Sequence, residues 1–170
     1  GDLDMRMDTS SGISAARWLK TVKEADLARV LKDYGEERFA KRIARAIVEE
    51  RQTTAITRTR QLAQIIAKAN PAWERNKDPA TRCFQAIRIF INSELTDLKR
   101  GLEKAVECLA VGGRLAVISF HSLEDRIVKR YFREQSRGDD FPPGVPVTQA
   151  QLNPRLRIVG KAIRPTEIEV

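Results

Sequence analysis

The chain has 170 residues, of which 42% are hydrophobic and 32% are charged, and this length allows one domain with a substantial core or a domain with an inserted subdomain. Its 31 lysines and arginines against 23 aspartates and glutamates leave a net charge of +8, which favours a polyanionic partner such as RNA without selecting a reaction. No apolar stretch approaches the roughly 20 residues of a membrane helix, and the first residues do not resemble a signal peptide, so we expect a cytoplasmic protein without membrane contact.

The first twelve residues are polar and are predicted to form a loop. Within them Asp4 and Asp8 flank Arg6, and Asp2 comes just before. Carboxylates at this spacing suit a cation or a ligand hydroxyl. The arginine between them equally favours a surface loop that neutralises itself, and both interpretations stay open.

Helical patterns then dominate as far as residue 110. Ser14 is predicted to cap a short helix, and Thr21 and Glu24 have the spacing of a capping box for the next one, which Gly35 ends. Apolar residues at helical spacing predict further helices over residues 36–51, from Thr57 to about residue 70, from Asp78 onward, and over 95–109.

The predicted helix at 36–51 has a basic face opposite its apolar stripe. Such a face suits contacts with phosphates, although a solvated charged face is the commoner explanation of this pattern. The basic face consists of Arg38, Lys41, Arg42 and Arg45.

Trp73 lies in a predicted loop between two helices, near Arg75 and Lys77. An aromatic ring among cations suits stacking on an unpaired base. The tryptophan could equally pack its own loop onto the helices.

Residues 111–132 combine the clearest strand pattern with the richest polar cluster. A nearly unbroken apolar run at 115–120 predicts a buried parallel strand, and helical spacing returns from Leu123. In open α/β sheets ligands bind outside the carboxyl ends of strands. The turn between the predicted strand and the helix, residues 119–126, is therefore a candidate site and is called the elbow below. Its candidate residues are Ser119, His121, Ser122 and Arg126.

A structural interpretation of the elbow competes with the functional one. Ser122, with Glu124 and Asp125 after it, supplies a helix cap and an acidic first turn. His121 is the only histidine of the chain, and a lone histidine is commonly a structural hydrogen-bonding residue. No zinc spacing accompanies it, and no metal is expected. The two cysteines, Cys83 and Cys108, are predicted to be buried in helices.

A second short strand is predicted at 156–159. Because two strands do not make a self-sufficient sheet, the chain is either mainly helical with a small sheet or part of a larger α/β domain. No glycine-rich nucleotide turn, P-loop or catalytic serine motif is present.

Four stretches together resemble one family, the ribosomal RNA small subunit methyltransferase H family. They occur in the family's order and span nearly the whole chain. The four stretches are LDMRMD from Leu3, YGEERFAKRIARAI from Tyr34, PATRCFQAIRI from Pro79 and GGRLAVISFHSLEDRIVK from Gly112.

The resemblance implies an α/β fold, namely an incomplete class I S-adenosylmethionine-dependent methyltransferase sheet of Rossmann-like type with a helical insertion, in a chain that is itself mostly α-helical. It implies segments at 1–13 and 83–170 from the methyltransferase domain and a helical insertion at 14–82. The cofactor, S-adenosylmethionine, would be bound by residues that precede Gly1, so we expect this chain alone to be inactive.

The same resemblance implies methylation of N4 of a cytosine in the decoding centre of bacterial 16S rRNA, with the small ribosomal subunit as partner and a homodimer as an open option. The segment Asp4–Asp8 and the elbow then form the substrate-side rim. Ser119, His121 and Ser122 would accept from or donate to the base, and Arg126 would bind a phosphate. Two other classes stay open: a non-catalytic basic RNA-binding module and a partner-docking module.

Overall fold

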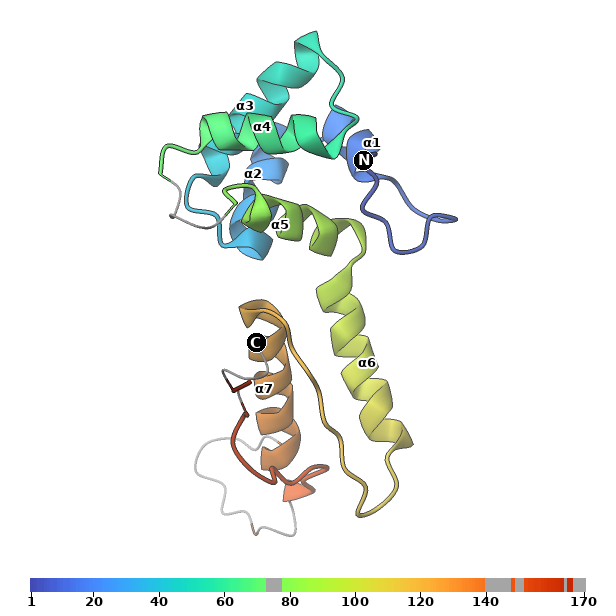
Figure 1. The fold of residues 1–170 in the computed structure, drawn as a ribbon. Coiled ribbons are helices and arrows are strands. Elements are labelled where there is room, and N and C mark those ends of the chain that lie inside the picture. The colour runs from blue at the N-terminus through green and yellow to red at the C-terminus, as the bar shows by residue number, and fades with distance from the viewer. Residues whose placement is uncertain (73–77, 140–147, 149–151, 164, 167–170) are drawn as a thin grey trace. The chain divides into compact units, whose positions relative to one another are not determined.

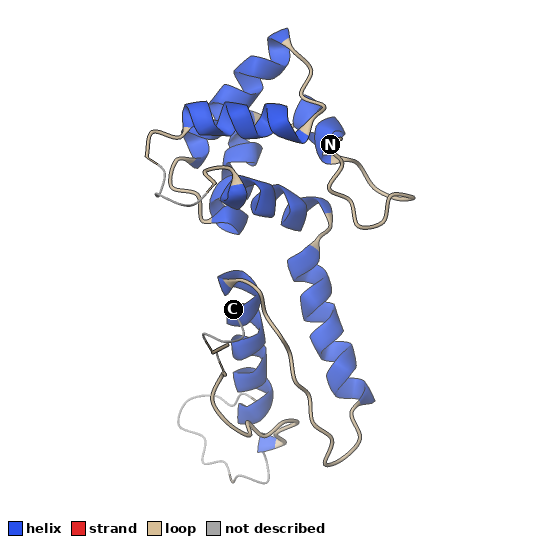
Figure 2. Ribbon diagram, viewed as in Figure 1, coloured by secondary structure: helices blue, strands red, loops and turns tan. Residues whose placement is uncertain are grey.

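The computed structural model describes the whole chain except residues 73–77, 140–147, 149–151, 164 and 167–170. The described residues form α-helices joined by loops, and they contain no strand, as Figure 2 shows. The chain divides into two compact units, Gly1–Glu94 and Leu95–Val170. The predominantly helical character expected from the sequence is confirmed, whereas the domain limits at residues 13 and 82 stay a prediction. Among the described residues no helix is both long enough and apolar enough to cross a bilayer.

The first unit is a bundle of five helices (Figure 1). Helix α2 packs against α3 and against α5, and α3 packs against α4. The helices are α1 (Ala15–Thr21), α2 (Glu24–Gly35), α3 (Ala40–Thr53), α4 (Thr59–Ala69) and α5 (Thr81–Ile91).

Apolar residues at helical spacing build the core of this unit. On α3 the predicted stripe is confirmed, since Ile43 and Ile47 are fully buried. Their counterparts on the neighbouring helices are fully buried too: Leu27 and Leu31 on α2, Leu62 and Ile66 on α4, and Ile87 on α5. Burying one such side chain stabilises the fold by about 1.5 to 3 kcal/mol, so the bundle has a core of its own.

The two cysteines differ in their surroundings. Cys83 is buried in α5 as predicted, and burial raises its pKa to about 12. Its thiol therefore stays protonated and unreactive near neutral pH. Cys108 lies in a helix as predicted, at the end of α6, but the prediction that it is buried is wrong, because it is exposed.

The predicted helix starts are confirmed at α1 and corrected at the next helices. Ser14 caps α1 as expected, with its Oγ accepting from the Arg17 amide at 3.3 Å. The capping box at Thr21 is wrong: Thr21 remains in α1, and Lys23 is the N-cap of α2. At α4 the N-cap is Arg58 instead of Thr57, and Gln61 Oε1 accepts from the Arg58 amide at 2.9 Å.

A partly buried arginine ties α3 to the end of α1. Arg51 donates from the same nitrogen to the carbonyls of Leu19 at 2.6 Å and Val22 at 2.7 Å. The last carbonyls of a helix have no partner inside the helix. Arg51 therefore satisfies two carbonyls at the end of α1 and connects this end to α3.

The second unit contains α7 (Ser122–Arg137) and nearly all of α6 (Glu94–Cys108). The predicted strands at 115–120 and 156–159 are wrong for the described structure, where both segments lie outside regular elements. A strand requires a neighbour that takes up its backbone hydrogen bonds, and the described residues provide none. Along the first segment, Ile118 is 83% exposed and Phe120 is 90% exposed.

Candidate functional site

The loop formed by residues 4–11, called the Asp4–Ser11 loop below, is anchored at its base. Leu3 is buried, and its amide donates to the Thr57 carbonyl at 2.9 Å. The Asp4 carbonyl accepts from the amide of Ala15 at 2.7 Å. The predicted loop is thus confirmed, and its first residue has a fixed position at the start of α1.

Arg6 folds back onto Asp4 inside the loop. Its Nε and Nη2 donate to the two carboxylate oxygens of Asp4 at 2.7 and 2.9 Å, and its Nη1 donates to the Ser11 carbonyl at 3.1 Å. This paired hydrogen bonding lowers the pKa of Asp4 and raises the pKa of Arg6. Asp4 and Arg6 therefore shape the loop and neutralise each other, as one of the two sequence interpretations expects.

Asp8 has different surroundings. Its carboxylate accepts from the Ser10 hydroxyl at 2.5 Å, the Ser10 amide at 2.9 Å and the Ser11 hydroxyl at 2.8 Å. These bonds, led by the Ser10 hydroxyl, lower its pKa. Because Asp8 is exposed and a carboxylate has about four acceptor positions, it is an oriented, ionised acceptor that still has capacity for a ligand.

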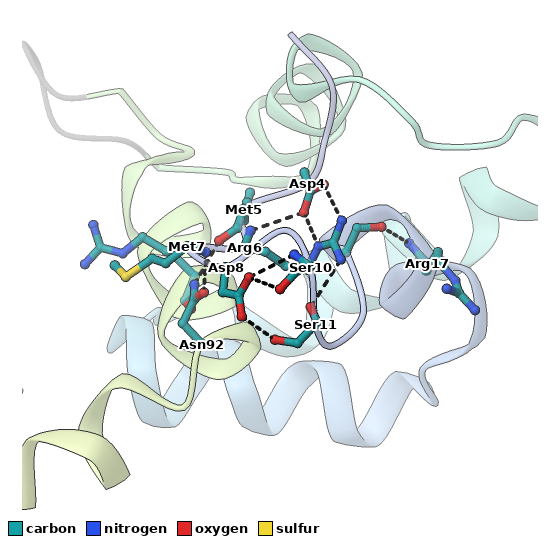
Figure 3. A network of polar contacts seen from close by, with 11 residues as sticks. Asp4, Met5, Arg6, Met7, Asp8, Ser10, Ser11, Arg17 and Asn92 are labelled. Atoms are coloured by element: carbon teal, nitrogen blue, oxygen red, sulfur yellow. Dashed lines mark hydrogen bonds and ion pairs between the residues drawn. The ribbon is translucent and has the colours of Figure 1, made fainter.

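Asn92, which follows α5 and is distant in the sequence, forms hydrogen bonds to the Asp4–Ser11 loop (Figure 3). Its Oδ1 accepts from the Met7 amide at 2.7 Å, and its Nδ2 donates to the Met5 carbonyl at 2.8 Å. Nδ2 also donates to the Arg88 carbonyl at 2.9 Å. Met5 lies between these anchors with φ of +66°, a conformation that non-glycine residues rarely adopt. Asn92 therefore holds this strained turn on both sides of Met5, whose own side chain packs against the core.

The predicted basic face lies on the outside of the bundle. All four of its residues are exposed. Arg38 stands over the ring of Phe39 at 5.4 Å from the centroid, and Arg45 donates to Glu49 at 2.8 Å. The members of the face are Arg38 just before α3 and Lys41, Arg42 and Arg45 on α3.

A groove of about 650 Å³ lies between α3 and α4, and the segment 54–58 joins these two helices. Two residues of the basic face line it. The complete lining is Arg42, Arg45, Ala46, Glu49, Glu50, Thr53, Thr54, Ile56, Gln61, Gln64, Ile65, Lys68 and Ala69.

At the elbow the helix cap is His121, one residue earlier than predicted. Its Nδ1 accepts from the Glu124 amide at 3.4 Å, and Glu124 Oε2 accepts from the Phe120 amide at 2.9 Å. Ser119 is partly buried, whereas Ser122 and Arg126 are exposed. The turn brings these predicted residues onto one short stretch at the start of α7. Trp73 lies outside the described residues.

Two features of the site have no counterpart in the sequence predictions. Asn92 follows an apolar helix and has only the pattern of an ordinary helix end, so no local signal connects it to a loop more than 80 residues away. The α3–α4 groove depends on the angle between two helices, which periodicity does not give.

A class I methyltransferase would hold S-adenosylmethionine at a glycine-rich turn between a strand and a helix. The described part of this chain has no such turn: Gly112 and Gly113 precede a segment without regular structure and do not open a helix. The described residues therefore do not by themselves supply the glycine-rich turn that this cofactor would need.

The sequence matches a methyltransferase family along its whole length. The model of this family, the MraW methylase family, matches residues 1–170, so the chain belongs to it. Two curated relatives are named ribosomal RNA small subunit methyltransferase H. The one from Marinomonas sp. (strain MWYL1) is 58% identical over 170 residues, and the one from Nitrosococcus oceani is 57% identical over 171 aligned positions. Each alignment covers 100% of this chain and 54% of the relative, so the chain spans about half of their length.

Proposed function

We propose that the whole protein transfers a methyl group from S-adenosylmethionine to the exocyclic N4 of a cytosine in the decoding centre of bacterial 16S rRNA. The observation that carries this proposal is the family match over residues 1–170, joined with the names of the two relatives. The net charge of +8 agrees with an RNA substrate.

The chemistry places specific demands on the protein. The lone pair of a cytosine amine is delocalised into the ring, so it must be turned out of conjugation and aimed at the methyl carbon. Acceptors that hold the amine hydrogens do this, and correct positioning supplies much of the rate enhancement. The base must also leave its stack to be reached.

Asp8 has the properties of such an acceptor. It is exposed, ionised and oriented by Ser10 and Ser11, and the clamp of Asn92 fixes the turn before it. We assign the orientation of the base to the Asp4–Ser11 loop. The ion pair between Arg6 and Asp4 stabilises this loop from within. At the elbow, Ser119, His121 and Ser122 are proposed to contact the base, and Arg126 a phosphate.

The remainder of the whole protein is proposed to hold the cofactor, since the described residues of this chain contain no glycine-rich turn for it. S-adenosylmethionine would supply the methyl group. Cytoplasmic location and a homodimer stay predictions.

A non-catalytic RNA-binding module is the second candidate function, favoured by the exposed basic face, which lies on α3 and at Arg38 just before it. One experiment separates the two. The whole protein and this chain alone are incubated with methyl-labelled S-adenosylmethionine and small ribosomal subunits. We expect label in 16S rRNA with the whole protein and none with the chain alone. Absence of label with both proteins, despite RNA binding, would favour the non-catalytic module.

Replacing His121 by alanine in the whole protein is expected to lower turnover about tenfold, equivalent to about 1.4 kcal/mol of transition-state stabilisation. The reason is its place at the elbow, beside Ser119 and Ser122. Turnover at saturating cofactor and the urea midpoint of unfolding are measured together.

The control is His121→Ser, because serine is a good N-cap but lacks an imidazole. A functional histidine predicts that both variants lose turnover. If serine restores turnover and the alanine variant loses mainly stability, by about 0.5 to 2 kcal/mol, then His121 is only a helix cap.

A further inference from the structure

The α3–α4 groove has the size and chemistry of a ligand site. Its volume of about 650 Å³ lies within the range of roughly 300 to 1,000 Å³ that small-molecule sites occupy. Both walls belong to helices of the same compact unit. The groove is therefore defined by packing within one bundle.

Cationic side chains line one part of the groove. Arg42 lies near the start of α3 and Lys68 near the end of α4, both far along their helices from the connecting segment 54–58. Arg45 lies one turn further along α3 and pairs with Glu49 at 2.8 Å. Because both members of that pair are largely exposed, the pair is weak and exchanges readily for a phosphate.

Apolar and acidic side chains line the part nearer the connecting segment. Ile65 is partly buried and leaves an apolar surface against which a base can lie, whereas Ile56 is only 6% exposed and adds little to that surface. Glu49 and Glu50 stand at the same end of α3. Carboxylates only accept hydrogen bonds, so they favour a base with an exocyclic amine and disfavour uracil, whose edge has carbonyl oxygens on both sides of its single N–H.

We propose that this groove binds one unpaired RNA nucleotide whose base carries an exocyclic amine, with its phosphate at Arg42 and Lys68 and its amine at Glu49 and Glu50. The inference rests on the proposed function in one respect, namely that the ligand is RNA. It goes further because the groove is a binding site for a nucleotide other than the methylated one.

The first test uses the full chain and two fluorescein-labelled RNA oligomers, oligocytidine and oligouridine of about ten nucleotides, a length matched to single-strand sites. Fluorescence anisotropy gives both affinities. We expect oligocytidine to bind about tenfold more tightly, the value of one hydrogen bond to a charged group. Equal affinities, or no binding of either oligomer, would overturn the proposal.

Variants assign the binding to the groove. The double variant Arg42→Glu, Lys68→Glu is expected to weaken both oligomers more than tenfold and to lower the salt dependence by about 0.7 for each phosphate that the protein no longer neutralises. Its matched control is Lys20→Glu, Lys32→Glu, which makes the same change of charge at exposed positions at the ends of α1 and α2. If the control weakens binding as much, only net charge matters and the proposal fails.

The variant Glu49→Ala, Glu50→Ala tests base selection. Both residues are exposed and alanine suits a helix, so the fold should persist, which the thermal midpoint checks. We expect the preference for oligocytidine to disappear while the salt dependence is kept. A preference that survives the loss of both carboxylates would contradict the assigned role.

The outcomes separate this inference from the proposed function. If the whole protein methylates 16S rRNA and the groove variants bind and methylate normally, the groove is not a nucleotide site and the proposed function stands. If the oligomers bind as expected but the whole protein transfers no methyl group, the site stands and the proposed function fails.

Discussion

Asn92→Ala in the whole protein is expected to lower kcat about a hundredfold, the loss that a displacement of about 1 Å at a reacting group can cause. Without this side chain the Met7 amide and the Met5 carbonyl lose their partners, at 2.7 and 2.8 Å. The turn at Met5, with its φ of +66°, then loses both of its hydrogen bonds to Asn92, and we expect the segment that carries Asp8 to shift. Methyl transfer at saturating cofactor measures the effect, and KM for the RNA should change less than kcat.

A control that also removes hydrogen bonds from a side chain to the backbone distinguishes a loss of positioning from a loss of stability. Arg51→Met removes the two hydrogen bonds that the charged guanidinium donates to the carbonyls of Leu19 and Val22. Each such bond contributes about 1.5 to 3 kcal/mol to stability. We expect this variant to have a lower unfolding midpoint with normal kcat. If Asn92→Ala loses activity only in proportion to its unfolded fraction, then Asn92 has no positioning role.

Gly35→Ala is expected to destabilise the first unit by about 1 to 3 kcal/mol, the usual cost of forcing extra atoms into a packed interface. A Cβ at Gly35 would lie 2.6 Å from the Arg82 carbonyl oxygen and 3.1 Å from the Ala86 Cβ. The first neighbour is backbone and cannot rotate away, so α2 and α5 must separate. Because Gly35 is the last residue of α2, alanine brings less than the roughly 0.8 to 1 kcal/mol of helix propensity that it gains in a helix interior, so the clash dominates.

Thermal unfolding measures this prediction, with a fall of about 4 to 8 °C expected for each kcal/mol in a unit of this size. Gly101→Ala is the matched control, because Gly101 lies in α6 with nothing within 4 Å of the added Cβ. The control should be neutral or slightly stabilising. An unchanged midpoint for Gly35→Ala would show that α2 and α5 have room between them.

Helix content is predictable from this sequence because apolar spacing reports burial directly. The stripe with Ile43 and Ile47 needs only the 3.6-residue period, and the structure buries both. Helix boundaries are less predictable: burial of Trp18 and Val22 at the end of α1 keeps Thr21 in that helix. The packing of these two residues thus outweighs the capping pattern that Thr21 and Glu24 form in the sequence.

The strand predictions are wrong for a different reason. Residues 115–120 have the composition of a buried strand, but composition does not supply the neighbour that a strand needs. In the described structure this segment has no regular secondary structure and Phe120 is exposed. The local pattern therefore indicates a propensity for a strand, but the described residues contain no second strand that could pair with it.

The candidate site is only partly predictable. Asp4, Arg6 and Asp8 stand out as a group in the sequence, and the structure brings them into one loop, but it divides their roles: Asp4 neutralises Arg6 while Asp8 faces solvent. That division depends on the turn at Met5 and on Asn92. A contact across 85 residues is a property of the fold and has no signature in either segment.

The position of the methyl group on the RNA tests the central claim most directly. Small subunits that lack the modification are treated with the whole protein and methyl-labelled S-adenosylmethionine, and the purified 16S rRNA is digested to nucleosides and separated by mass. We expect the label to occur in N4-methylcytidine from the decoding centre. Label on a ring carbon of cytosine, on a ribose, or on a different RNA would contradict the proposed function.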